Sequence, residues 1–239
     1  MKVVLSIGGS VLAPGLDADR VRAHAAAVER VREAGCSLGV VVGGGEVARD
    51  YIGTARELGA NEMQLDQLGI AVTRLNARLL IAALGEAASV APAPDYETAV
   101  AAMRRDEVAV MGGVAAGQTT DAVSAALAES VDADLLVFAT SVDGVYSADP
   151  NTDSTAERYP ELTAGELVEV IAGIEMSAGS SAPVDLLGAK LIERSGLRAI
   201  VLDGSDPDRV VDAILTGDHS GTNVLPDPDA PVPPLWAQG

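Results

Sequence analysis

Glycines directly follow three apolar runs that are typical of strands, and glycine turns in that position can bind a phosphate. These turns are Gly8-Gly9 after residues 3–7, Gly43-Gly44-Gly45 after 38–42, and Gly112-Gly113 after 108–111. Because the carboxyl ends of parallel strands meet at one edge of a sheet, we expect the three turns to lie together there. Glycine leaves its backbone N–H open to an anion, and the following helix adds the positive end of its dipole. The alternative interpretation of each turn is tight backbone packing.

Lysine is nearly absent, which restricts how a phosphate can be bound. The P-loop pattern G-x-x-x-x-G-K-[ST] does not occur, and Lys2 and Lys190 are the only lysines among 16 basic residues. Lys190 falls on a predicted helix. Arginine does not reproduce the compact charge of an ammonium group, so Lys190 could be retained because a site needs that charge. The alternative is that this lysine has been retained by chance and has no role in a site.

Arginine and hydroxyl groups follow the second and third turns. Arg49 lies one helical turn after Gly45, where it either binds an anion at the helix start or pairs with Glu46 or Asp50. The segment GGVAAGQTTDAV (112–123) ends in two threonines and an aspartate as a helix begins. The threonines can cap this helix or donate to a phosphate, and the aspartate is either a first-turn acid or an organiser of cations.

The segment FATSVDGVYSADP (138–150) is the least helical stretch of the chain. Hairpin-turn chemistry accounts for Asp143-Gly144. It does not account for the nearby Tyr146 and Asp149, which we therefore retain as candidate site residues. His24 and His219 have no metal-ligand spacing around them, so we interpret both as packing or surface residues and expect no dedicated metal site.

The acidic composition argues against several classes of partner. There are 35 acidic against 16 basic residues, of which 14 are arginine, and the net charge is −19. Nucleic acid and anionic membranes both require a basic face, so we expect neither as a partner. The excess of acids with almost no lysine is typical of proteins from a salt-loaded cytoplasm; the alternative is an ordinary acidic solubility surface.

Short apolar runs alternate with stretches of helical period, which predicts an α/β fold with a mainly parallel sheet. The strand candidates are residues 3–7, 38–42, 108–111, 135–139 and 199–202, with 88–91 and 222–225 as weaker ones. Helix starts are predicted at Asp17, Asn61, Thr163 and Asp206 from their capping patterns, with helix ends at Gly35 and Gly85.

The chain is predicted to form a single domain over residues 1–226, followed by a Pro-rich mobile tail at 227–239. An alternative for the tail is docking of Trp236 on a neighbour. We find no pattern for a signal peptide or a membrane span, and the single Cys36 excludes an internal disulfide. These features together predict a protein of the reducing cytoplasm.

The motifs GGSVL, VVVGGGEVAR, GGVAAGQTTDAV and TSVDGVYSADP, with GDHSGTNV near the end, resemble the amino acid kinase family in its archaeal uridylate kinase branch. They occur in the family's order from residue 5 to about residue 225. The resemblance implies a three-layer α/β/α sandwich with a central, mainly parallel sheet. It also implies transfer of the ATP γ-phosphoryl group to UMP with Mg²⁺, and a homohexamer built as a trimer of dimers.

The resemblance assigns roles to matching positions. ATP contacts are implied for Gly9, Ser10, Gly45, Arg49, Thr140, Tyr146 and Asp149. UMP contacts are implied for Gly44, for Asp66 at the ribose hydroxyls, and for the loop Val114, Ala115, Ala116, Gly117, Gln118, Thr119 and Thr120. Arg49 and Asp121 are the implied catalytic residues, and Lys190 is a further catalytic candidate by position.

This chain departs from the family pattern at two places. Ser6 stands on the first strand where many relatives have lysine, and AGSSAPVDLLGAK stands where some sister kinases have Gly-Met-x-x-Lys. Two other functions remain open: a sister kinase acting on a carboxylate, a carbamate or isopentenyl phosphate, and a non-catalytic nucleotide-binding storage or regulatory protein. Asp66 argues against the first because those acceptors have no ribose, and the retained Gly44, Arg49 and Asp121 argue against the second.

The charge predicts a specific response to salt. At −19 per chain, unscreened repulsion opposes folding, subunit contact and the approach of anionic nucleotides. The screening length falls from about 10 Å at 0.1 M to about 3 Å at 1 M salt. We therefore expect melting temperature and specific activity to rise together from low salt toward molar KCl. Full activity near 0.1 M that declines as KCl is added would instead indicate an ordinary acidic surface.

Overall fold

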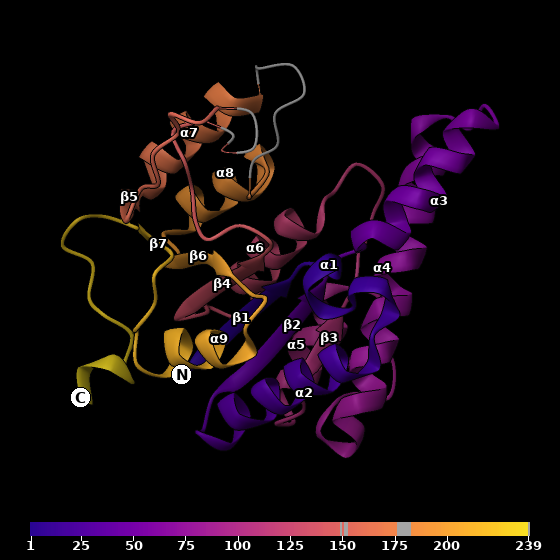
Figure 1. Ribbon diagram of the computed structural model, residues 1–239. Coiled ribbons are helices and arrows are strands. Elements are labelled where there is room, and N and C mark those ends of the chain that lie inside the picture. The colour runs from indigo at the N-terminus through magenta and orange to yellow at the C-terminus, as the bar shows by residue number, and fades with distance from the viewer. Residues whose placement is uncertain (149, 151–152, 176–182, 239) are drawn as a thin grey trace.

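The structure is a computed structural model that describes residues 1–148, 150, 153–175 and 183–238. Its central sheet has the strand order β3-β2-β1-β4-β6-β7-β5 (Figure 1). The strands are β1 Lys2–Ile7, β2 Ser37–Val42, β3 Ala109–Met111, β4 Leu135–Thr140, β5 Glu161–Thr163, β6 Ala199–Asp203 and β7 Thr222–Leu225. The first five strands in this order are mutually parallel, whereas β7 is antiparallel to β6 and parallel to β5.

Helices cover both faces of the sheet, as expected for an α/β/α sandwich. The helices are α1 Gly9–Leu12, α2 Ala18–Glu33, α3 Gly45–Glu57, α4 Glu62–Leu84, α5 Tyr96–Arg104, α6 Thr120–Ser130, α7 Ala164–Glu175, α8 Leu186–Ser195 and α9 Pro207–Leu215. Their starts carry strong local signals. Asp17 caps α2, and Asn61 and Gln64 form a reciprocal capping box at α4.

Alternation along the strands divides the core into two apolar layers. Val3, Leu5 and Ile7 of β1 pack with α2, α9 and part of α4, whereas Val4 of the same strand packs with α5, α6, α7 and α8. This arrangement follows from the two-residue period of a strand, which sends neighbouring side chains to opposite faces. The long runs without polar residues are therefore buried on both sides, as is typical of parallel sheets.

The five main predicted strands are confirmed, and residues 222–225 also form a strand, β7. Residues 88–91 do not form one; Ala88 makes an isolated bridge to Val108. The sequence analysis missed β5 because three residues are too few to display a period, and it missed α1 because a single turn of helix follows Gly8 immediately. His24 is buried at 2% exposure on α2, in agreement with a packing role.

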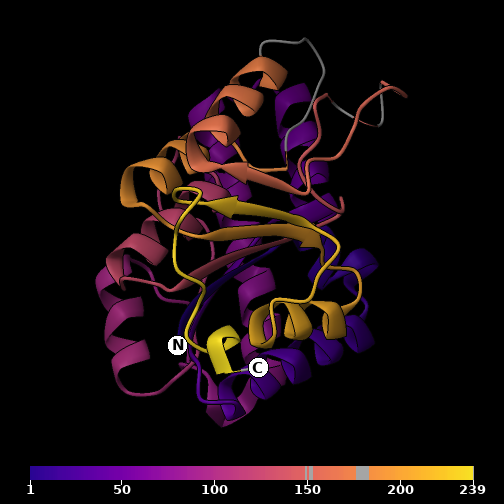
Figure 2. The ribbon, with the colours of Figure 1, turned by 90° about the vertical axis from the view of Figure 1, so that its left-hand side faces the viewer.

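The segment after residue 227, which the sequence predicted to be a mobile tail, contacts the body of the protein through Trp236. The indole Nε1–H donates to the Ile214 carbonyl oxygen at 3.0 Å, and the Arg198 guanidinium lies 6.0 Å from the indole ring centre. Gly217, with φ of +78°, leaves room for this ring. The segment around Trp236 lies beside α9 (Figure 2).

Helix α4 is long and apolar enough to meet the length and composition criteria for a membrane-crossing helix, over residues 62–87. One helix of this kind is weak evidence for a membrane span, because core helices meet the same criteria. Its Ala77, Leu80 and Leu84 are buried against β2 and α2, so the apolar character of that face is explained by the core.

Candidate active site

The three glycine turns lie at the carboxyl ends of β1, β2 and β3, where the sequence predicted them to meet. The first two are in direct backbone contact. A Cβ on Gly45 would lie 2.5 Å from the Gly9 carbonyl carbon and from the Ser10 nitrogen, and Gly45 has φ of +64°. A Cβ on Gly9 would lie 2.5 Å from the Gly43 carbonyl oxygen. Glycine at these positions is thus required by packing, whether or not it also contacts a ligand.

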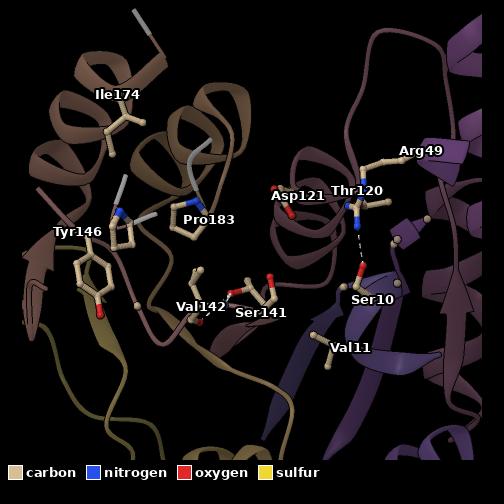
Figure 3. A pocket seen from close by; sticks show the side chains of 18 of the residues that line it. Ser10, Val11, Arg49, Thr120, Asp121, Ser141, Val142, Tyr146, Ile174 and Pro183 are labelled. Carbon is tan, nitrogen blue, oxygen red and sulfur yellow. Dashed lines mark hydrogen bonds between the residues drawn. The ribbon is translucent and has the colours of Figure 1, made fainter. Parts of the chain in front are cut away.

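A cavity of about 290 Å³ opens above these turns (Figure 3). We call it the first cavity. One wall is formed by the turns after β1 and β2 together with Arg49, and the opposite wall by the segment after β4, including Tyr146. Thr120 and Asp121, at the start of α6, line the space between these walls. Figure 3 shows Arg49 and Ser10 on one side and Tyr146 on the other.

A second cavity, of about 280 Å³, adjoins the first. Gly44, Gly45 and Thr120 line both, so the two spaces share a wall of backbone and one hydroxyl group. The second cavity is otherwise bounded by Asp66 and Ile70 of α4 and by the end of the loop before α6. Two neighbouring cavities with a shared wall suit a reaction between two bound molecules.

The side chain of Arg49 turns toward the first cavity. Its Nη2 donates to the Ser10 hydroxyl at 3.2 Å. Among the described residues Arg49 forms no ion pair, so the alternative pairing with Glu46 or Asp50 is absent from this part of the structure. An exposed guanidinium beside a serine hydroxyl and glycine N–H groups is suited to bind an anion.

Asp121 has an unusual protonation behaviour. Burial of its carboxyl group, followed by the neighbouring charge of Asp185, raises the pKa of Asp121 to about 7. A hydrogen bond from the Asp185 backbone acts in the opposite direction. A carboxyl group with such a pKa at the wall of a cavity marks a candidate functional site, because two acids that share a site cannot both ionise freely.

The loop between β3 and α6, residues 112–119, is held by α4 at two points. Gly113 donates its N–H to the Thr73 hydroxyl at 2.7 Å and accepts from Arg74 Nε at 3.0 Å. Farther along, the Gly117 N–H donates to Asp66 Oδ2 at 2.8 Å. Gly117 has φ of +80°, which glycine adopts without strain. Helix α4 therefore fixes the shape of this loop before any ligand binds.

Comparison with known proteins agrees with this geometry. The family model described as "Amino acid kinase family" matches residues 1–203 of this chain. The chain is 71% identical over 227 residues to a uridylate kinase of Halobacterium salinarum, covering 95% of this chain and 94% of that one. The chain belongs to the amino acid kinase family.

Two further relatives extend the similarity. A uridylate kinase of Halorubrum lacusprofundi is 65% identical over 226 residues, covering 95% of this chain and 94% of that one. The crystal structure of uridylate kinase from Archaeoglobus fulgidus superimposes with a TM-score of 0.84 at 44% identity, covering 94% of this chain and all of that one. The three-layer fold that the resemblance implied for this family member is confirmed.

Most predicted site residues of this family member lie around the two cavities. Gly9, Ser10, Gly44, Gly45, Arg49, Asp121, Thr140 and Tyr146 line the first cavity; Asp66, Gln118, Thr119 and Thr120 line the second. Val114, Ala115, Ala116 and Gly117 are in the same loop but are not among the residues that line either cavity. Asp149 lies outside the described residues.

Lys190 is not among the described residues that line the cavities. It lies on α8 and pairs with Glu193 at 2.9 Å, with 54% of its side chain exposed. Lys2 lies at the start of β1, and its Nζ donates to the Val131 carbonyl oxygen at the end of α6. This contact places a compact cation at the negative end of a helix dipole. Ser6, at the position of the family lysine, is buried in β1 at 6% exposure.

The sequence analysis missed the polar residues of α4 that support the site. Thr73 holds Gly113, and Asn76 Nδ2 donates to the carbonyl oxygens of Gly43 at 2.9 Å and Gly44 at 3.1 Å. Both side chains are buried. Polar residues within the apolar stripe of a core helix are the signal that would have found them, because buried polar groups need a specific partner.

The raised pKa of Asp121 predicts a pH-dependent cost to folding. A carboxyl whose folded pKa lies above its unfolded value binds more protons when folded, so it destabilises the protein as pH rises from about 4 to about 7. Asp121→Asn removes this cost and should raise the free energy of unfolding at pH 8 by on the order of 1–3 kcal/mol. Urea unfolding of both proteins at pH 5 and pH 8 checks this: part of the cost is already present at pH 5, so the gain should be clearly larger at pH 8. An equal effect at both pH values would show that Asp121 is not protonated in the folded protein.

Proposed function

We propose that this protein is a UMP kinase that transfers the γ-phosphoryl group of ATP to UMP, giving UDP and ADP. An oxygen of the UMP phosphate attacks the γ-phosphorus, and the bond to the oxygen that bridges the β- and γ-phosphates breaks. The observation that carries the proposal is the pair of cavities that share Gly44, Gly45 and Thr120, in a chain 71% identical to a protein named uridylate kinase. Phosphoryl transfer requires two anions to be aligned and neutralised rather than covalent catalysis.

ATP is assigned to the first cavity. The N–H groups of Gly9 and Gly45 and the Ser10 hydroxyl lie where the phosphates would bind, and Arg49 is the cation that faces them. The ring of Tyr146 lines the far wall, while its hydroxyl donates to Asp143 at 2.7 Å. With its polar end thus engaged, the ring is suited to pack against the base or the ribose. Thr140 and Asp149 complete the proposed ATP contacts.

UMP is assigned to the second cavity, between α4 and the loop that ends at Thr120. The Asp66 carboxylate already accepts the Gly117 N–H at Oδ2, so its other oxygen is the one proposed to accept the ribose hydroxyls. The threonines at the start of α6 and the backbone of Gly44 would face the UMP phosphate. The loop 114–120 would close over the nucleotide.

The transfer centre is assigned to the space between Arg49 and Asp121. A guanidinium at that point neutralises charge that builds up on the transferring group. ATP is proposed to enter as its Mg²⁺ complex, for which the Asp121 carboxylate is a suitable type of ligand beside substrate phosphates. Lys190 remains a catalytic candidate only by its position in the sequence, since it is not among the described residues that line the two cavities.

The chain is further proposed to form a homohexamer, built as a trimer of dimers. The feature that supports self-association is a set of exposed apolar side chains on and beside α3 and α4, the helix pair at the right of Figure 1. Its members are Tyr51, Leu58, Met63, Leu75 and Leu79, each between 41% and 83% exposed. Large exposed apolar side chains of this kind can be buried in subunit interfaces.

The cellular setting follows from the same proposal. UDP formation belongs to pyrimidine nucleotide biosynthesis, and we assign the protein to the cytoplasm. The relatives from Halobacterium and Halorubrum, together with the net charge of −19, support adaptation to a salt-rich cytoplasm.

The function is tested by following ADP and UDP formation with UMP, dUMP, CMP and N-acetylglutamate in high KCl. We expect UDP from UMP, and a lower kcat/KM for dUMP. The missing hydroxyl leaves the Asp66 carboxylate partly unpaired, which typically costs on the order of 1–3 kcal/mol. Equal kcat/KM for UMP and dUMP would contradict the role of Asp66, and activity on N-acetylglutamate alone would contradict the proposed substrate.

Arg49→Ala should reduce kcat/KM far more than it reduces stability. Loss of one charged donor to a transferring group costs roughly 2–4 kcal/mol of transition-state binding, whereas an exposed arginine contributes about 0–1 kcal/mol to folding. Arg56→Ala is the matched control, because Arg56 lies on the same helix and pairs with Glu62 at 3.4 Å. Steady-state kinetics and melting temperatures of both variants decide this, and near-normal turnover of Arg49→Ala would reduce Arg49 to a surface residue.

A further inference from the structure

The first turns of α6 and α8 meet beside the first cavity, and each helix is capped by a residue that also contacts the other. Thr119 is the N-cap of α6, where its hydroxyl oxygen accepts the Ala122 N–H at 3.1 Å. Asp185 is the N-cap of α8, where its Oδ1 accepts the Gly188 N–H at 2.9 Å. These are two ordinary caps, each of which satisfies a backbone donor that the helix leaves unpaired.

The two caps are linked to each other. The Thr119 hydroxyl donates to Asp185 Oδ2, while the Asp185 backbone hydrogen-bonds to the Asp121 carboxylate. Asp185 thus uses both carboxylate oxygens and its backbone, in three directions. A simple N-cap needs only one of these bonds, so the other two require an explanation beyond the stability of α8.

The helices are also in close contact at this point. A Cβ on Gly188 would lie 3.3 Å from the Asp121 carbonyl carbon and 3.4 Å from the Asp121 Cβ. The first turn of α8 therefore packs directly on the residue that faces the cavity. Pro183, two residues before the cap, lines the same cavity (Figure 3). Any movement of the start of α8 would be transmitted to Asp121.

We propose that Asp185 is a positioning residue for phosphoryl transfer. It holds the end of the loop between β3 and α6 (residues 112–119, the acceptor loop) and the carboxylate of Asp121 against the start of α8. The loop is held by Asp66, Thr73 and Arg74 of α4 on one side. On its other side the loop is held by Asp185 at the start of α8, which accepts the Thr119 hydroxyl. The end of this loop and the carboxylate of Asp121 are thus held to the start of α8 by one residue, through the carboxylate and the backbone of Asp185 respectively. This inference rests on the proposed function for its catalytic part.

Two substitutions separate the roles of Asp185. In Asp185→Ser the shorter side chain still caps α8 but cannot also reach Thr119. In Asp185→Asn the amide oxygen can still accept the Gly188 N–H, the NH2 group can donate to the Thr119 hydroxyl oxygen in place of accepting from it, and the charge is lost. Asp95→Ser is the matched control, because Asp95 caps α5 in the same way, accepting the Thr98 N–H at 2.8 Å, and is not among the residues that line the cavities.

The first readout needs no substrate. Amide hydrogen exchange over residues 114–123 of the unliganded protein should accelerate about tenfold in Asp185→Ser and stay unchanged in Asp95→Ser. This result tests the lock even if the wild-type protein makes no UDP, an outcome that would overturn the proposed function instead.

The second readout is kinetic. We expect kcat for UDP formation to fall at least about tenfold in Asp185→Ser, with a loss of melting temperature no larger than in Asp95→Ser. Asp185→Asn should retain most of kcat, because its amide can still cap α8 and contact Thr119. The proposal would be overturned if Asp185→Ser showed the loop exchange and the kcat of the wild-type protein. It would also be overturned if Asp185→Asn were as impaired as Asp185→Ser.

Discussion

The close approach of two backbone turns is the constraint on which the rest of the site depends. Gly9 and Gly45 come so near each other at the ends of β1 and β2 that neither position has room for a Cβ. This contact brings the starts of α1 and α3 to one point on the wall of the first cavity. Asn76 of α4 then fixes the second turn through the carbonyl oxygens of Gly43 and Gly44. A side chain at either glycine would force the turns apart and remove the wall that the two cavities share.

The same geometry explains how an acidic chain with two lysines can suit anionic ligands. Neither lysine is among the described residues that line the first or the second cavity: Lys2 binds the carboxyl end of α6, and Lys190 pairs with Glu193 on the surface. Positive potential comes instead from backbone N–H groups, from the starts of α3 and α6, and from Arg49. Backbone dipoles contribute without adding a mobile charge and work equally well in concentrated salt, because short contacts inside a cavity are screened little.

Carboxylates in this protein act mainly as structural acceptors, and the site uses them in that way too. Asp66 holds the Gly117 N–H, and Asp185 holds both a helix start and the Thr119 hydroxyl. Asp121 differs because its carboxyl group is buried and also lies beside a second acid, Asp185, and both effects raise its pKa to about 7. The folded state therefore tolerates an unfavourable carboxyl at the place where two substrates would meet. Strain of this kind is typical of functional sites rather than of surfaces chosen for stability.

The sequence by itself determined the α/β class, the five main parallel strands and the edge at which the glycine turns gather. It could do so because burial on both faces leaves uninterrupted apolar runs, and because turns after parallel strands must share an edge. The sequence pattern indicated β7 only weakly and did not indicate β5, because strands of three or four residues are too short to display a period. The contact of Trp236 with α9 could not be predicted either, because a single aromatic contact leaves no periodic pattern. Tertiary structure alone decided which polar groups meet: Thr73 with Gly113, Asp66 with Gly117, and Asp185 with Thr119. These pairs are separated by 40 to 66 positions in the chain, and only the packing of α4 and α8 around the loop brings them within hydrogen-bond distance.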